Sequence, residues 1–298
     1  MKVLKTAKTL SLVGLTSYLT YKSISDLLFK KAFNKNPLNE EIDDIYLKWF
    51  DNSKHTNINI NSYDGLNLNG YLVENNDTNN YIVLVHGIMQ DDKSMYKYAY
   101  EFDKLGYNCL LIDQRASGLS QGLYYTFGLK ESQDLVKWVN YLVSYKPNIQ
   151  ICLFGVSMGA ATCMMALDYN LKENVKCIIE DSSYASLKDE LIHLIQYKFK
   201  IFSPGVILKL FEEKMYSNYG FKFKDICPKK CLNTNKIPIL LIHGNRDRVV
   251  PFNTLKILYN NNLGEKKYYE VKGKDHLETL TSENYFKNLN DFVLKYFD

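Results

Sequence analysis

The sequence predicts an α/β fold in which a mostly parallel sheet carries helices on both faces. Short continuous apolar runs such as YIVLV and ILLI are typical of strands that are covered on both sides. Helical patterns lie between these runs, and regular alternation of strand and helix favours a doubly wound sheet. A hydrophobic content of 46% with 23% charged residues excludes disorder and low-complexity scaffolds. With 298 residues, two domains or one large domain with an insertion fit equally well.

Eight strands are expected, and the first two differ from the rest. Residues 57–61 and 66–73 alternate apolar and polar side chains, as a half-exposed antiparallel hairpin does. The buried strands are predicted at 81–86, 107–113, 149–155, 175–181, 237–243 and 267–271. Helices are predicted at 91–105, 129–145, 157–169, 251–260 and 283–296.

Residues 185–236 break this alternation between the sixth and the seventh strand. The segment has helical patterns at 187–199 and 206–216, and a gap of this length in a compact domain usually carries function. It contains ten lysines, five acidic residues and five phenylalanines, namely Phe199, Phe202, Phe211, Phe221 and Phe223. We therefore expect a small helical lid, with residues 37–184 and 237–298 forming the core.

Residues 1–36 form a basic leader with seven lysines and a single acidic residue, Asp26. A lysine-rich start followed by the moderately apolar stretch 9–20 predicts an anchor or amphipathic segment that meets an anionic membrane surface. Lys22 and Asp26 interrupt the apolar run, which argues against a clean membrane span. The alternative to membrane attachment is that the leader forms an amphipathic helix packed on the body of a cytoplasmic protein. Because the body is near-neutral, a nucleic-acid partner is not expected.

The six cysteines favour buried, reduced thiols, because four of them lie inside apolar runs. Cys227 and Cys231 have C-x3-C spacing, but no second cysteine pair or nearby histidine accompanies them. We expect no metal and no cofactor.

The strongest chemical signal is a buried strand that runs directly into G-x-S-x-G and then into a helix, at residues 151–160. A serine at the tip of such a strand-to-helix turn is an exposed nucleophile, and glycines two residues before and after it let the flanking segments approach closely. Ser157 is therefore the candidate nucleophile, with Gly155 and Gly159 shaping the turn.

A serine hydroxyl needs a base and an acid that orients the base. Of the five histidines, His276 follows the last strand in a short polar loop, where its imidazole can reach the strand ends, and we expect it to be the base. Asp247, in the loop after the seventh strand, fits the order serine, acid, histidine. Asp181 and Asp275 are the alternative acids.

Backbone amides are expected to stabilise the negative charge that develops on the substrate carbonyl oxygen. One is the amide of Met158, at the helix N-terminus directly after the nucleophile. The second is the amide of Ile88, in the loop after the third strand. For His86, which precedes this loop, a bracing role is favoured over a catalytic one.

Taken together, these motifs resemble those of the α/β-hydrolase superfamily. The resemblance rests on H-G-I-M at 86–89, D-Q-R-A-S-G-L-S at 113–120, G-V-S-M-G-A at 155–160, the block at 237–251 and G-K-D-H at 273–276. The S-M-G turn and the D-x-R-x-x-G-x-S loop resemble the serine-aminopeptidase and monoacylglycerol-lipase-like branch, and the basic leader resembles its bacterial membrane-anchored members. Where that family often has glycine after the arginine of the loop, this chain has Ala116.

The sequence thus predicts a serine hydrolase that cleaves a carboxylic ester through an acyl-enzyme, without a cofactor. The basic, phenylalanine-rich lid and the leader favour an apolar acyl chain presented near an anionic membrane. The alternatives are a serine aminopeptidase or amidase of the same fold, and a noncatalytic binding protein that retains the fold.

Overall fold

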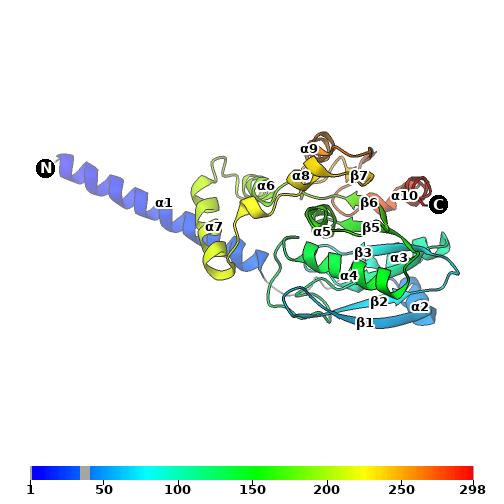
Figure 1. The fold of residues 1–298 in the computed structure, drawn as a ribbon. Helices are drawn as coiled ribbons and strands as arrows, with labels where there is room; N and C mark the ends of the chain where they lie inside the picture. The colour runs from blue at the N-terminus through cyan, green and yellow to red at the C-terminus, as the bar shows by residue number, and fades with distance from the viewer. Residues whose placement is uncertain (1, 34–40, 298) are drawn as a thin grey trace.

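The computed structural model describes residues 2–33 and 41–297, with residues 2–15 in backbone only. An eight-stranded sheet forms its centre, in the order β1-β2-β4-β3-β5-β6-β7-β8 (Figure 1). The strands are β1 (His55–Asn61), β2 (Asn67–Val73), β3 (Asn80–Val85), β4 (Asn108–Ile112), β5 (Gln150–Val156), β6 (Val175–Asp181), β7 (Ile239–Gly244) and β8 (Lys266–Val271).

The sheet is antiparallel at one edge and parallel elsewhere. β1 pairs antiparallel with β2, and β2 pairs antiparallel with β4, whereas all pairings among the strands β3 to β8 are parallel. The predicted hairpin, the parallel block and all eight predicted strands are confirmed, with strand ends that move by no more than two residues. The parallel strands bring their carboxyl ends to one edge of the sheet, which is where ligands bind in open α/β sheets.

Helices cover both faces of the sheet, and each face has its own apolar core (Figure 1). On one face, α2 (Asp44–Asn52), α3 (Tyr96–Lys104) and α10 (Tyr285–Val293) pack through aromatic side chains such as Phe50, Phe102 and Phe292. On the other face lie α4 (Glu131–Tyr145), α5 (Met158–Met165) and α9 (Asn253–Asn261), around the fully buried Trp138.

Two of the predicted helices are each divided into two segments. The predicted helix 91–105 is split into a short 3-10 helix, η1 (Asp92–Met95), and α3, because the Asp91 side chain accepts the Lys93 amide and starts η1. The helix predicted at 157–169 ends as α5 at Met165 and continues as the 3-10 helix η2 (Ala166–Asp168). Helix α2 was not predicted from the sequence.

Residues 185–236 form a group of short helices beside the carboxyl edge of the sheet. They are α6 (Leu187–Phe199), α7 (Gly205–Tyr219), η3 (Phe223–Asp225), α8 (Pro228–Cys231) and η4 (Leu232–Thr234). Ser186 caps α6 by accepting the Asp189 amide, and Gly220 ends α7 in the left-handed conformation at φ 79°. We call this group the lid.

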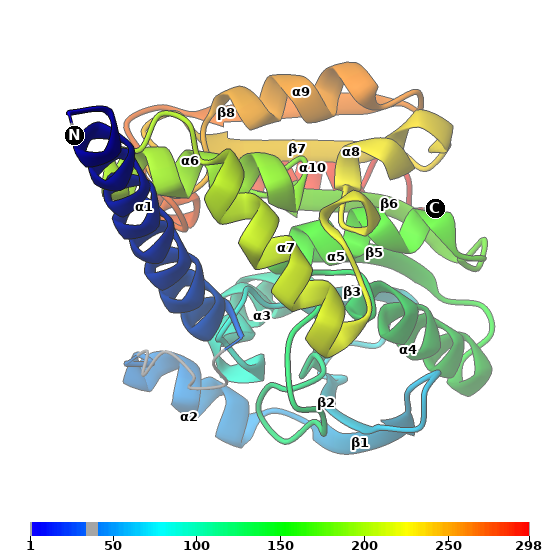
Figure 2. The ribbon, with the colours of Figure 1, turned by 90° about the vertical axis from the view of Figure 1, so that its left-hand side faces the viewer.

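The leader forms one 31-residue helix, α1 (Lys2–Ala32), that lies beside α7 and extends away from the body (Figures 1 and 2). The helix continues through Lys22 and Asp26, and Asp26 forms an ion pair with Lys214 of α7 at 2.8 Å. Phe29 packs against Phe211 and Tyr219 of the same lid helix. Within the part of the chain that is described, no helix combines the length and the apolarity that a membrane span requires.

Candidate active site

Ser157 occupies a strained turn between β5 and α5. Its φ of 55° and ψ of −118° are unfavourable for a residue with a side chain, and such strain is typical of a nucleophile held at a sharp strand-to-helix turn. A β-carbon at Gly155 would collide with the Gly159 carbonyl, and one at Gly159 would collide with the Val85 carbonyl of β3. Only glycine therefore fits these two positions. The Ser157 amide donates to the Asp181 carbonyl at 2.8 Å and ties the turn to β6.

The structure brings Ser157, His276 and Asp247 together, although 119 residues separate the first two in the chain. The Nε2 atom of His276 lies 3.2 Å from the Oγ of Ser157, and its Nδ1 lies 2.7 Å from Oδ2 of Asp247. Asp247 follows β7 and His276 follows β8, so the carboxyl ends of three strands supply the three groups. These distances place a serine hydroxyl group, an imidazole and a carboxylate within hydrogen-bond reach of one another, the arrangement of a serine triad.

Asp247 is buried and rigidly held. Its Oδ1 accepts the amides of Val249 and Val250, both at 2.8 Å, which leaves Oδ2 to face the imidazole of His276. Burial by itself would raise the pKa of Asp247, but hydrogen bonds from His243 and His276 outweigh burial and hold the pKa well below its usual range. The carboxylate is therefore ionised at neutral pH.

Asp247 also faces a second histidine, which sequence reasoning did not assign to the site. His243, the penultimate residue of β7, places Nε2 3.2 Å from Oδ2 of Asp247 and 3.1 Å from the Val250 carbonyl. Burial opposes protonation of this imidazole, yet the carboxylates of Asp247 and Glu180 outweigh burial and raise the pKa of His243. The H-G-N-R-D spacing, which puts a histidine four residues before the acid, was the available sequence signal.

The lid contributes a buried carboxyl group beside the acid. Glu190 of α6 is 8% exposed, and burial together with the negative charge of Asp247 raises its pKa to about 8. A neutral Glu190 adds no second negative charge beside Asp247 at neutral pH.

The two predicted oxyanion-hole residues lie in neighbouring segments. Met158 begins α5, so its amide is one of the first four helical amides, which have no acceptor within their own helix. Ile88 and Met158 pack in one apolar cluster with Tyr125. A β-carbon at Gly87 would stand 3.6 Å from the Cβ of Ser157, which places the loop after β3 directly against the nucleophile.

His86 braces this loop rather than facing Ser157. The Gln114 amide lies 3.1 Å from His86 Nε2, and His86 Nδ1 lies 2.7 Å from the Gly87 carbonyl. Burial lowers the pKa of His86, which keeps the imidazole neutral so that Nε2 accepts the Gln114 amide. The bracing interpretation from the sequence agrees with these contacts.

The alternative acids point elsewhere. Asp181 accepts the hydroxyl groups of Thr279 at 2.6 Å and of Tyr285 at 2.5 Å, inside the core. Asp275 accepts the amide of His276 at 2.8 Å and forms an ion pair with Arg248, so it does not reach the His276 ring nitrogens. Asp247 is the acid that faces the imidazole.

Hydrogen bonds and ion pairs of charged side chains fix the D-x-R-x-x-G-x-S loop at residues 113–120. The Asp113 carboxylate accepts the amides of Asp92 at 3.0 Å and Leu119 at 2.9 Å. Arg115 is bidentate to the buried Asp134. Ala116 has φ 63°, the left-handed region that favours glycine, so this chain keeps the loop's conformation with a residue that is strained there.

All six cysteines are buried and free. Cys227 and Cys231 belong to this set, and the Sγ of Cys231 lies 3.2 Å from a carboxylate oxygen of Asp168. Among the residues that the structure describes, no group of three histidine, cysteine, aspartate or glutamate side chains is placed to hold a metal ion.

A strained serine at the strand-to-helix turn, a histidine and a buried aspartate at the carboxyl edge of a mostly parallel sheet define the class of α/β hydrolases. The family model described as alpha/beta hydrolase fold matches residues 80–203, which include Ser157. The chain has the α/β-hydrolase fold.

Curated relatives match the chain over much of its length. The chain is 26% identical over 274 residues to the uncharacterized protein YqkD of Bacillus subtilis, which covers 90% of this chain and 89% of that protein. It is 24% identical over 196 residues to protein bem46 of Schizosaccharomyces pombe, covering 64% of this chain and 59% of that protein.

Two solved structures share the fold. The Pyrococcus furiosus esterase Pf2001 superposes with a TM-score of 0.71 at 23% identity, covering 89% of this chain and 100% of that chain. The acylaminoacyl peptidase of Pyrococcus horikoshii gives a TM-score of 0.61 at 18% identity, covering 85% of this chain and 44% of that chain.

Proposed function

We propose that the protein is a serine hydrolase that cleaves a carboxylic ester through an acyl-enzyme. The observation that carries this proposal is the continuous path from the Oγ of Ser157 through both nitrogens of His276 to the ionised Asp247. The two short contacts fix the imidazole with Nδ1–H toward the carboxylate and an unprotonated Nε2 toward the hydroxyl group, which is the tautomer that a general base requires.

In the first half of the reaction, Oγ of Ser157 attacks the ester carbonyl carbon while Nε2 of His276 takes the hydroxyl proton. The carbonyl oxygen becomes negative, and the amides of Met158 and Ile88 donate to it. Loss of one such donor typically costs about 2.7–4 kcal/mol of transition-state stabilisation. The intermediate then expels the alcohol, which takes the proton from His276, and leaves the acyl group on Ser157.

In the second half, water attacks the acyl-enzyme and gives its proton to Nε2 of His276. The second tetrahedral intermediate collapses, the carboxylic acid leaves, and the proton returns to Ser157. Asp247 remains ionised throughout and stabilises the imidazolium that forms twice in each cycle.

Labelling with a fluorophosphonate probe tests the nucleophile before any substrate is known. Wild-type protein is expected to be labelled once, and Ser157→Ala is expected to remain unlabelled. A wild type that resists the probe, or a Ser157→Ala variant that is labelled equally, would favour a noncatalytic protein that retains the fold. Equal rates on aminoacyl p-nitroanilides and p-nitrophenyl esters would favour the peptidase alternative.

The lid phenylalanines give only partial support to an apolar acyl chain. Phe211, Phe221 and Phe223 are buried in the cluster that the lid forms with α1, so they offer no free surface to a substrate. Phe202 is 85% exposed and is the lid phenylalanine placed to contact a lipid or an acyl chain. Comparing p-nitrophenyl acetate with p-nitrophenyl octanoate tests this preference, which Phe202→Ser is expected to reduce.

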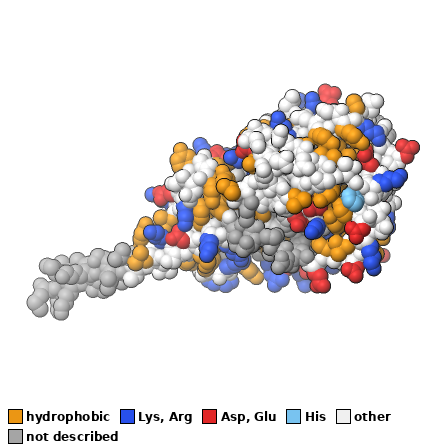
Figure 3. Space-filling model, turned by 90° about the horizontal axis from the view of Figure 1, so that it is seen from below, with side chains coloured by type: hydrophobic (Ala, Val, Ile, Leu, Met, Phe, Trp, Pro, Cys, Tyr) orange, Lys and Arg blue, Asp and Glu red, His pale blue; other side chains and the backbone are white. Residues whose placement is uncertain are grey.

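We also propose that α1 meets an anionic membrane surface. The helix exposes Tyr18, Leu19 and Leu27, and its first eight residues include three lysines. Lysine, acidic and apolar side chains lie side by side where α1 joins the body (Figure 3). Such a mixture of basic and apolar groups favours binding at the interface of anionic lipids.

Sedimentation with vesicles tests the membrane proposal without removing the helix. The variant Lys2→Gln, Lys5→Gln, Lys8→Gln is expected to lose binding to vesicles that contain phosphatidylserine, by about 1 kcal/mol for each lysine. The matched control, Lys172→Gln, Lys256→Gln, Lys272→Gln, removes the same charge from exposed positions of the body and is expected to bind as the wild type does. Equal binding of both variants would contradict the proposal.

A further inference from the structure

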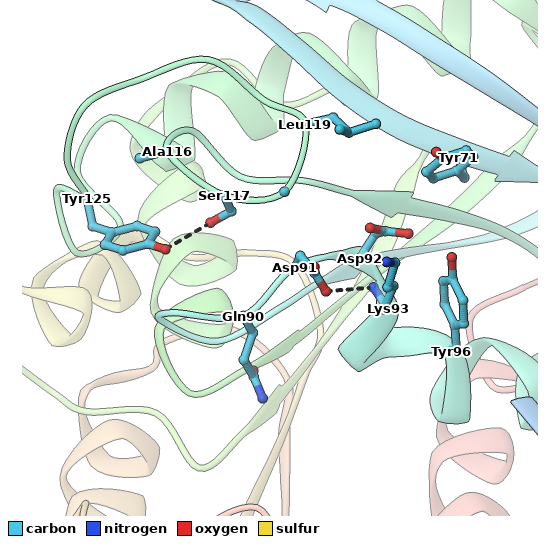
Figure 4. A pocket seen from close by; sticks show the side chains of 11 residues that line it. Tyr71, Gln90, Asp91, Asp92, Lys93, Tyr96, Ala116, Ser117, Leu119 and Tyr125 are labelled. Carbon is cyan, nitrogen blue, oxygen red and sulfur yellow. Dashed lines mark hydrogen bonds between the residues drawn. The ribbon is translucent and has the colours of Figure 1, made fainter. Parts of the chain in front are cut away.

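A recess of about 420 Å³ lies beside the oxyanion loop, between β2, η1 and the loop that begins at Asp113 (Figure 4). The residues that matter for its chemistry are Tyr71, Gln90, Asp91, Asp92, Tyr96 and Tyr125. It is separate from the group of Ser157, Asp247 and His276, none of which lines it.

The recess is nevertheless connected to the nucleophile through one short loop. Gln90 lines the recess, and its Oε1 accepts the amide of Gly87 at 2.9 Å. Gly87 lies next to Ser157, since a β-carbon added at Gly87 would stand 3.6 Å from the serine Cβ. On the other side, Tyr125 lines the recess and packs in one cluster with Met158. A substrate bound at Ser157 can therefore extend a substituent past this loop into the recess.

The carboxyl group of Asp92 is the unusual group in this recess. Asp92 is 4% exposed, and its Oδ2 accepts no hydrogen bond from any residue that the structure describes. A buried polar atom without a partner is costly, and native structures usually satisfy such atoms. Figure 4 shows this carboxyl group on the same side of the recess as the rings of Tyr71 and Tyr96.

The charged groups around Asp92 make the recess acidic. Asp91 lines it, and Asp113 stands behind Asp92 and accepts the Asp92 backbone amide at 3.0 Å. Lys93 is the exposed basic residue of the lining, and no ion pair joins it to either lining aspartate among the described residues.

The acidic surroundings of Asp92 also affect its protonation. Burial, followed by the negative charges of Asp113 and Asp91, raises the pKa of Asp92 to about 7, while a hydrogen bond from the Tyr96 hydroxyl group to the Asp92 carboxyl group and the charge of Lys93 oppose this rise only partly. A positive charge placed beside the carboxyl group would favour its ionised form.

We propose that this recess binds a protonated amine carried by the substrate, with Asp92 as its counter-ion and the rings of Tyr71 and Tyr96 beside the cation. A carboxylate is an acceptor-only group and an ammonium group is donor-only, so the pair satisfies the lone Oδ2. Aromatic faces attract a desolvated cation within about 6 Å. The inference rests on the proposed function, since it assigns part of the ester substrate to this recess.

Matched substrates test the inference on both sides of the ester bond. On the acyl side, p-nitrophenyl 6-aminohexanoate is compared with p-nitrophenyl heptanoate, which replaces the ammonium group by a methyl group. On the alcohol side, butyrylcholine is compared with 3,3-dimethylbutyl butyrate. For at least one pair, wild type is expected to prefer the cationic member in kcat/KM by on the order of 10- to 100-fold, the effect of a charge-assisted contact.

Asp92→Asn is expected to abolish this preference while changing kcat/KM for the neutral esters by less than about threefold. Asp77→Asn removes the same charge from an exposed position outside the recess and is expected to keep the preference. A wild type without a preference for either cationic ester, or an Asp92→Asn variant that retains it, overturns the inference.

A binding measurement separates this inference from the proposed function. Calorimetry with Ser157→Ala is expected to show n-butylammonium binding at least about tenfold more tightly than n-butanol, with the difference lost in Ser157→Ala, Asp92→Asn. If no ester is hydrolysed but the amine binds in this way, the proposed function fails and the recess stands. If esters are hydrolysed and the amine binds no better than the alcohol, the recess assignment fails alone.

Discussion

Replacing Asp247 by asparagine probes the whole proton path, because the structure fixes how the new amide must be oriented. Oδ1 of Asp247 accepts two amides, from Val249 and Val250, so the carbonyl oxygen of an asparagine would keep that position. The amide NH2 group would then stand where Oδ2 is now, facing the Nδ1 atom of His276. A donor would face a donor, and the imidazole would be driven into the other tautomer, with Nδ1 accepting and Nε2 protonated.

An imidazole with a proton on Nε2 cannot take the proton of Ser157. The expected loss in kcat is about 10⁴-fold, the size of this effect in serine triads, which corresponds to about 5.5 kcal/mol of barrier. His243 does not compensate, because its Nε2 lies 3.2 Å from Oδ2 of the same carboxylate and keeps only the Val250 carbonyl as an acceptor.

The assay is the initial rate on p-nitrophenyl butyrate, with the rate of fluorophosphonate labelling as a second readout. Asp275→Asn is the comparison, since Asp275 neighbours His276 but does not contact its ring nitrogens, and we expect it to lose less than about tenfold. An Asp247→Asn variant that keeps a tenth of wild-type kcat would refute the tautomer argument. A larger loss in Asp275→Asn than in Asp247→Asn would mean that the orienting acid has been wrongly assigned.

Further predictions concern the nucleophile, the loop and the lid. Ser157→Ala is expected to lower turnover by on the order of 10⁴–10⁶ without lowering the melting temperature, since alanine keeps the size and the backbone conformation; scanning calorimetry and kinetics check both. Gly118→Ala is expected to destabilise the fold by at least about 2 kcal/mol, and to lower the melting temperature by about 4 °C or more, because Gly118 has φ 48° and a β-carbon would collide with the carboxylate at the start of its loop. Gly205→Ala, which meets nothing within 4 Å, is its control and is expected to be neutral or stabilising by up to about 1 kcal/mol. Because burial raises the pKa of Glu190 to about 8 from an ordinary value of 4.5, the folded state binds its proton more tightly, and stability is expected to fall as the pH rises from 4.5 to 8. Glu190→Gln is expected to reduce this decrease in the free energy of unfolding, measured by denaturant titration at a series of pH values. An unchanged decrease would show that the buried carboxyl group of Glu190 is not its cause.

The sequence was sufficient to predict the sheet, because buried parallel strands are recognisable as continuous apolar runs without tertiary information. It also predicted which serine, histidine and acid lie together, since each follows a strand whose carboxyl end faces the same edge. These predictions depend on local patterns and on the topology that such patterns impose.

Contacts between distant segments could not be predicted. The ion pair between Asp26 of α1 and Lys214 of α7 joins side chains that are 188 residues apart in the chain. Helix α2, which was not predicted, packs Phe50 against Tyr96 of α3 at a centroid distance of 4.4 Å. The unpartnered oxygen of Asp92 depends on three segments that meet only after folding.

The aromatic seam between α1 and the lid has a consequence for any shortened form of the chain. Phe33, directly after α1, lies tilted against Tyr219 of the lid at a centroid distance of 4.5 Å and meets Phe127 of the core edge-on at 5.3 Å, and Phe29 of α1 lies against Phe211. A shortened chain that begins after this helix would lack one side of the apolar cluster, and the aromatic rings of the lid would be exposed to water. Such a fragment is expected to self-associate through these exposed rings. A loss of turnover in the fragment would then reflect a disturbed lid and not the loss of membrane attachment.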